Sequence, residues 1–106
     1  MSRTLDAAGT RRVLEEVLEE RLRQDAKWGV QNHDPPTWLM ILGEEVGEVN
    51  QAALEYHFHQ FDKAAPERGP RTLDDYRREL VQVAAVAVSM IECLDRQQAA
   101  ATGEQD

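Results

Sequence analysis

The sequence predicts an all-α fold, an antiparallel helix bundle formed by a single domain over residues 1–106. Apolar residues recur at three- and four-residue steps, which is the spacing of one face of an α-helix. Aromatic residues make up only 6% of the chain, whereas sheet proteins are rich in aromatic and β-branched residues. Proline and glycine gather at two places and divide the chain into three helical stretches.

The first helix is expected over residues 10–26, with Thr10 as its N-cap. We expect its acidic pairs, Glu15–Glu16 and Glu19–Glu20, to form the solvated outer face. A loop should follow over residues 27–36, where a glycine and a Pro–Pro pair prevent the helix from continuing. The apolar face of this helix comprises Val13, Leu14, Val17, Leu18 and Leu22.

The second and third helices are expected over residues 37–61 and 72–97, with Thr37 capping the second. The small, polar tail, residues 98–106, is expected to be disordered. The stretch from Leu80 to Ile91 contains no charged residue and is apolar nearly all round, so it needs more cover than three helices provide. We therefore expect a homodimer, or a tetramer built from dimers, in which subunits share a four-helix core.

Charge and cysteine content restrict the function. Twenty acidic against twelve basic residues give a net charge of −8, which repels nucleic-acid backbones and anionic membranes. No direct DNA or RNA binding and no membrane binding are expected, although an anionic substrate can bind through a metal ion. Cys93 is the single cysteine, which predicts a buried thiol in a reducing compartment. Without a signal-peptide pattern or an apolar run of roughly 20 residues, a cytoplasmic location is expected.

Two helices place acidic residues on their apolar faces. At about 100° per residue, Glu45 falls within the apolar arc that contains Leu42 and Val49. Glu48 lies one turn further along the same stripe of the second helix. On the third helix, Glu79 lies on the same face as Val83 and Val86. The residues that adjoin Glu79 are Asp75 and Gln82.

These inward carboxylates predict a divalent-metal site. Burying a carboxylate without a partner costs several kcal/mol, and two acidic stripes repel each other unless a cation lies between them. Oxygen ligands suit Mg²⁺ first and Mn²⁺ second. The alternative is that Glu45 or Glu79 pairs with a buried arginine, for instance Arg77 or Arg78 of a neighbouring subunit.

The same residues resemble a known family. The stretches EEVGE at 44–48 and ELVQ at 79–82, in three helices, are similar to the MazG-like branch of the all-α nucleoside triphosphate pyrophosphohydrolases. The stretches RQDAKWGVQNH at 23–33 and ELVQVAAVAVSMIECLDR at 79–96 strengthen the resemblance. It implies Mg²⁺-dependent hydrolysis of an NTP or dNTP to the monophosphate and pyrophosphate, as nucleotide-pool house-cleaning.

Carried over by motif, the resemblance gives a metal site and catalytic residues. It implies that Glu44, Glu45, Glu48 and Glu79 bind metal, with Glu44 and Glu48 taking part in catalysis. Gln82 stands where the family pattern has Asp, and a neutral amide is a poorer Mg²⁺ ligand. The alternative function is therefore a non-catalytic helical binding or regulatory module that keeps the fold and a weakened metal site.

A substrate site is expected beside these acids. Trp28 can stack a nucleobase, because a ring face binds any base, whereas Trp38 is expected in the core. Arg78 is a candidate phosphate ligand. A structural loop and a solvated basic patch are the competing interpretations. The candidates for reading the base edge are Gln31, Asn32 and His33.

Overall fold

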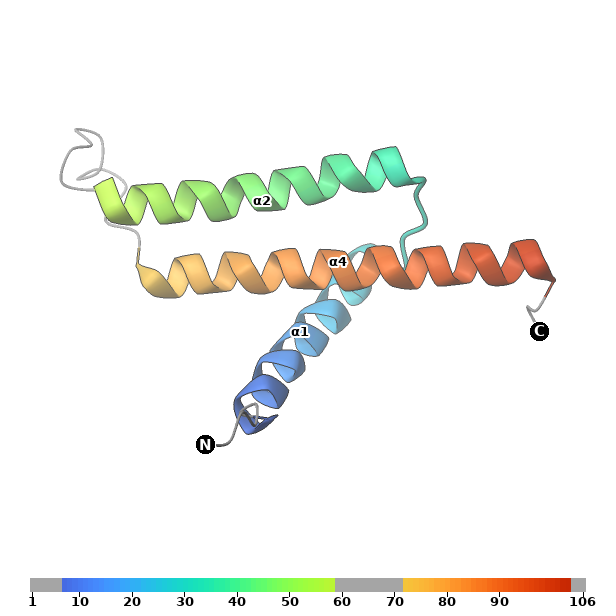
Figure 1. Cartoon of the computed structure of the whole chain (residues 1–106), viewed down its shortest axis with the longest axis horizontal. Helices are drawn as coiled ribbons and strands as arrows, with labels where there is room; N and C mark the ends of the chain where they lie inside the picture. The colour runs from blue at the N-terminus through green and yellow to red at the C-terminus, as the bar shows by residue number, and fades with distance from the viewer. Residues whose placement is uncertain (1–6, 59–71, 104–106) are drawn as a thin grey trace, which may run out of the picture.

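The structure is a computed structural model that describes residues 7–58 and 72–103, all of them helical apart from short connecting segments. It contains helices α1 (Ala7–Trp28), α2 (Pro35–Phe58) and α4 (Leu73–Thr102). Figure 1 shows α2 and α4 lying side by side and antiparallel, while α1 crosses α4 at a steep angle. The all-α prediction is confirmed, and within the described residues there is no strand.

Helix α1 begins at Ala7 and ends at Trp28, so it is longer at both ends than predicted. Gly29 follows with a φ of 76°, a left-handed conformation that ends a helix at little cost for glycine. Trp28 therefore lies in the last turn of α1 and not in the loop. Its ring therefore projects from the end of a helix, and Trp28 directly follows Lys27 in the sequence.

Helix α2 begins two residues earlier than predicted, and Thr37 is not its cap. The carboxylate of Asp34 accepts a hydrogen bond of 3.0 Å from the backbone N–H of Thr37, which is the capping role. Pro35 fits directly after this cap, because the first helical residue has no use for an N–H donor. The predicted end of this helix at residue 61 lies outside the described residues.

Helix α4 continues well beyond its predicted end. A capping box opens it, in which Thr72 and Asp75 each accept a hydrogen bond from the other's backbone N–H. Gly103 closes it in the left-handed conformation, with a φ of 75°. The prediction of a disordered tail is therefore wrong for residues 98–102, where several alanines favour helix, and residues 104–106 lie outside the described part.

The packed core is small and lies mainly between α2 and α4. Trp38 is only 5% exposed, as predicted, and its ring meets His33 edge-on at 4.8 Å between centroids. Cys93 is a buried free thiol, also as predicted. Among the described hydrophobic residues, the buried ones are Val17, Trp38, Ala52, Ala85, Val86 and Cys93.

Helix α1 docks on α4 through polar residues. Glu20 and Arg21 are both buried, so the prediction that the Glu19–Glu20 pair is solvated is wrong for Glu20. Arg21 donates to Asp25 at 2.8 Å on its own helix and to Glu92 at 2.6 Å on α4. The leucines expected on the inner face of this helix, Leu14, Leu18 and Leu22, are exposed instead.

A second polar connection joins the two helices near the start of α4. Arg77 forms two hydrogen bonds, of 2.7 and 2.6 Å, with the carboxylate of Glu16. Because of this contact, the pKa of Glu16 lies below its ordinary value. In the part of the chain that the structure describes, no helix is long and apolar enough to cross a membrane.

Candidate active site

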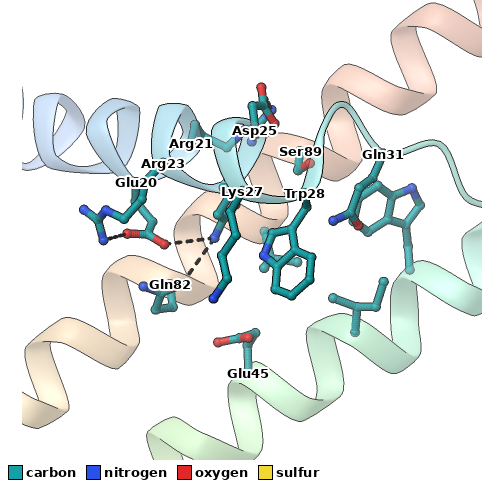
Figure 2. A pocket seen from close by; sticks show the side chains of 14 residues that line it. Glu20, Arg21, Arg23, Asp25, Lys27, Trp28, Gln31, Glu45, Gln82 and Ser89 are labelled. Atoms are coloured by element: carbon teal, nitrogen blue, oxygen red, sulfur yellow. Dashed lines mark hydrogen bonds and ion pairs between the residues drawn. The ribbon is translucent and has the colours of Figure 1, made fainter.

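A pocket of about 380 Å³ lies where α1, the loop after it, α2 and α4 meet. We call it the central pocket, and Figure 2 shows it with α1 above and α2 below. Glu45 of α2 points into it from one side, and Lys27 and Trp28 of α1 reach into it from the other. It brings together four of the residues singled out in the sequence, namely Trp28, Gln31, Glu45 and Gln82.

The pKa of Glu45 is raised from an ordinary value of 4.5 to about 7. Burial is the largest cause, because it disfavours the charged carboxylate. Charge repulsion from Glu48, Glu79 and Glu44 adds to it, and so does a hydrogen bond with Glu48. Three glutamates therefore act electrostatically on Glu45, from two helices that are adjacent in space.

The four glutamates differ in exposure. Glu45 and Glu79 are half-buried, whereas Glu44 and Glu48 are exposed on α2. In the described residues, no three acidic, histidine or cysteine side chains are gathered closely enough to hold a metal ion as they stand. Rotations of the exposed glutamate side chains would be needed to bring their oxygens together.

No arginine neutralises Glu45 within the described residues. The two arginines considered for this role are engaged elsewhere in the same chain, since Arg77 pairs with Glu16 and Arg78 pairs with Asp75. Among the described arginines the buried one is Arg21, which pairs with Asp25 on α1 and with Glu92 on α4. The repulsion around Glu45 is therefore not relieved by any ion pair of Glu45 in the described part of the chain.

Gln82 is tied to α1. Its side-chain oxygen accepts a hydrogen bond of 3.2 Å from the amide nitrogen of Gln24. The same Gln24 nitrogen donates to Glu20 at 3.3 Å, and Arg23 also pairs with Glu20. Figure 2 shows these bonds as a chain of contacts across the edge of the central pocket.

Glu20 and Gln24 were not among the residues singled out in the sequence, although the sequence holds a signal for them. Val17, Glu20, Arg21 and Gln24 follow the spacing of three, four and seven residues that marks one face of a helix. The neighbouring leucines, Leu14, Leu18 and Leu22, form a more apolar stripe. Their side of α1 was therefore predicted to face the core, but it is exposed.

The loop residues proposed to read a base are divided between two places. Gln31 lines the central pocket, whereas Asn32 accepts hydrogen bonds of 3.2 and 2.9 Å from Arg96 on α4. His33 packs against Trp38 and lines a separate apolar pocket of about 240 Å³. Asn32 and His33 thus hold the loop against α4, outside the central pocket.

Arg78 also lies outside the central pocket. It is exposed and donates to Asp75 at 2.9 Å, one turn earlier on α4. It lines an adjoining hollow between α1 and α4, which shares Gln82, Glu20 and Arg23 with the central pocket. The cationic side chains that reach the central pocket come from α1.

Comparison with known proteins adds no assignment, because no family model matches the sequence, and no curated protein or solved structure matches it significantly.

Proposed function

We propose that the protein is a Mg²⁺-dependent pyrophosphohydrolase that converts a nucleoside or deoxynucleoside triphosphate to the monophosphate and pyrophosphate. The observation that carries this proposal is Glu45, a carboxylate in a pocket, opposed by burial and by three neighbouring glutamates. An acid whose charge is this unfavourable is typical of a functional site, because structural acids acquire a cationic partner.

The donor set fits a hard divalent cation. Carboxylate oxygens are the ligands that Mg²⁺ and Mn²⁺ prefer, and a cation would remove the repulsion among the glutamates. Glu45, Glu48 and Glu79 are the proposed ligands, with Glu44 at the edge of the site. A bound Mg²⁺ would supply charge neutralisation at the phosphate oxygens during hydrolysis of the α–β anhydride.

The protein's own residues would then position substrate and water. Glu48 or Glu44, both exposed on α2 and both acting electrostatically on Glu45, would accept a proton from the attacking water. Trp28 is 63% exposed, and a base can stack on its ring. Gln31 is the one loop candidate that lines the same pocket and can bond to the base edge.

Gln82 supports a second candidate function. Its oxygen is engaged by Gln24, so the position where the resembled family has Asp serves here to bind α1. A metal site with one charge fewer binds Mg²⁺ less tightly, which favours a non-catalytic helical binding or regulatory module as the alternative. Magnesium binding and turnover separate the two functions.

The direct test is pyrophosphate release from a panel of ribo- and deoxyribonucleoside triphosphates with Mg²⁺ or Mn²⁺. Turnover of at least one substrate is expected, with Glu48→Gln lowering kcat by about 100-fold or more while helicity is unchanged. The matched control is Glu15→Gln, which removes an exposed acid of α1 and should keep full activity. No turnover with any substrate, together with no Mg²⁺ binding by calorimetry, would leave only the binding module.

We further propose that the active form is a homodimer, or a tetramer built from dimers, in which a second copy covers the apolar surface of α4. This proposal concerns the assembly alone and is independent of the chemistry.

A further inference from the structure

Lys27 is a positively charged residue that lines the central pocket on the wall opposite Glu45. It is one helical turn after Arg23, and Figure 2 shows its side chain running from α1 toward the carboxylate of Glu45. Unlike Arg23, which pairs with Glu20, it forms no ion pair in the part of the chain that the structure describes. Its ammonium lies 4.8 Å from the centre of the Trp28 ring instead.

A cation–π contact at an exposed site is weak, worth about 0.5–1 kcal/mol. Trp28 is largely exposed, so this contact holds the Lys27 ammonium lightly. The ammonium lies over one face of the ring, where a stacking nucleobase would compete with it. A base that occupies this face has to displace the ammonium, and Lys27 lines the same pocket.

A nucleoside triphosphate would bring several negative charges into a pocket that is bordered by Glu45 and its neighbouring glutamates. A metal ion offsets part of the repulsion between phosphate and carboxylate. A flexible cation on the opposite wall would offset more of it, because an ammonium is a compact charge with three donors. Lys27 is the pocket residue that offers such a cation without an existing ion pair.

We propose that Lys27 is a phosphate-binding residue that rests on the Trp28 ring until a base displaces it. The bound base takes the ring face, and the ammonium moves to the phosphate chain. The inference rests on the proposed function for the class of ligand, a nucleoside triphosphate, and it adds a residue and an order of contacts to that site. Arg78, the phosphate ligand predicted from the sequence, is bound to Asp75 outside this pocket.

The test is calorimetric binding, in the presence of Mg²⁺, of a nucleoside, its monophosphate and an α,β-methylene triphosphate that cannot be hydrolysed. Lys27→Gln should weaken triphosphate binding by about 10-fold or more and leave nucleoside binding equal or slightly stronger. The matched control is Arg12→Gln, which removes one positive charge from an exposed site on the same helix. It should bind all three ligands as the wild type does.

A second readout follows the Trp28 ring. Iodide quenches exposed indoles, so Trp28 should be quenched in the free protein while Trp38, at 5% exposure, is protected. Saturating nucleoside should protect Trp28 in the wild type and in Lys27→Gln alike. Circular dichroism of the variant confirms that the helices are intact.

Three results would overturn the inference. Unchanged triphosphate binding by Lys27→Gln would mean that Lys27 does not contact phosphate. Equal losses for nucleoside and triphosphate would mean that Lys27 only orders the Trp28 ring. If the wild type hydrolyses triphosphates in either of these cases, the proposed function stands without Lys27, whereas absence of any nucleotide binding by the wild type contradicts both proposals.

Discussion

Glu45 shows how one residue links the fold to its chemistry. The helical wheel places it at the edge of the core, and the structure places it in the central pocket with a pKa of about 7. An acid whose pKa is higher in the folded state than in the unfolded chain contributes stability below its unfolded pKa. That contribution is lost as the pH rises through the folded pKa.

The metal-free protein should therefore lose stability between about pH 4.5 and pH 7 relative to the Glu45→Gln variant. We expect this difference in the free energy of unfolding to reach about 1–2 kcal/mol, because water reaches the site and reduces the effect. Urea unfolding at a series of pH values in EDTA measures it. Mg²⁺ should restore the wild type at pH 7 but have less effect on the variant.

The control for this measurement is Glu15→Gln, which changes the same group at an exposed position of α1. It should follow the wild-type pH dependence throughout. If Glu45→Gln and Glu15→Gln behave alike, Glu45 is not destabilised in the folded state, and the main support for the metal site is lost.

The burial of a single residue could be predicted only where the correct side of its helix was taken as the inner face. Glu45 was found because the apolar residues around it define the inner face of α2 correctly. Glu20 was missed because the reference on α1 was its leucine stripe, which is exposed. The contact between Lys27 and Trp28 depends on side-chain direction at a helix end, and helical periodicity alone does not give that direction.

At the scale of elements, the three helices and the antiparallel packing of α2 and α4 were predictable, whereas the steep crossing of α1 over α4 was not. Their existence follows from long periodic stretches separated by glycine and proline. Their ends depend on single caps, so choosing Thr37 over Asp34 shifted the start of α2. The crossing of α1 over α4 rests on polar contacts such as that between Arg21 and Glu92, which hydrophobic patterning does not reveal.

We predict that Arg21 is the main polar determinant of α1 docking. Arg21→Met should lower the free energy of unfolding by about 1–3 kcal/mol, because it leaves Asp25 and Glu92 without their partner at a partly buried site. Adding Glu92→Gln should recover part of the loss, since one unpaired charge is then removed. Urea unfolding followed by circular dichroism measures both variants.

Arg11→Met provides the matched comparison, because Arg11 lies exposed near the start of the same helix. It should change the free energy of unfolding by less than about 0.5 kcal/mol. A loss for Arg21→Met that is no greater than this would mean that α1 is held on α4 by apolar contacts alone.

At the scale of the whole molecule, the chain is less compact than a typical domain of its length. Its radius of gyration is 17.7 Å, against about 13 Å expected for a globular chain of 100 residues. Large apolar side chains are exposed on all three helices, among them Leu18 on α1, Met40 on α2 and Ile91 on α4. Exposed apolar surface of this extent is typical of an interface between proteins.

A core shared with a second copy, as proposed from the apolar stretch of α4, would account for this surface. Ile91 is 59% exposed and lies on that stretch, so a second copy packing there would bury it. We expect sedimentation to show a dimer or tetramer at micromolar concentration, with a melting temperature that rises with protein concentration. Ile91→Glu should shift the species toward monomer, because it would place a charge within the interface, whereas Gln98→Glu on the exposed end of α4 should not. A wild-type chain that sediments as a stable monomer would contradict the shared core, because Ile91 and the other exposed apolar residues of α4 would then have no second copy to cover them.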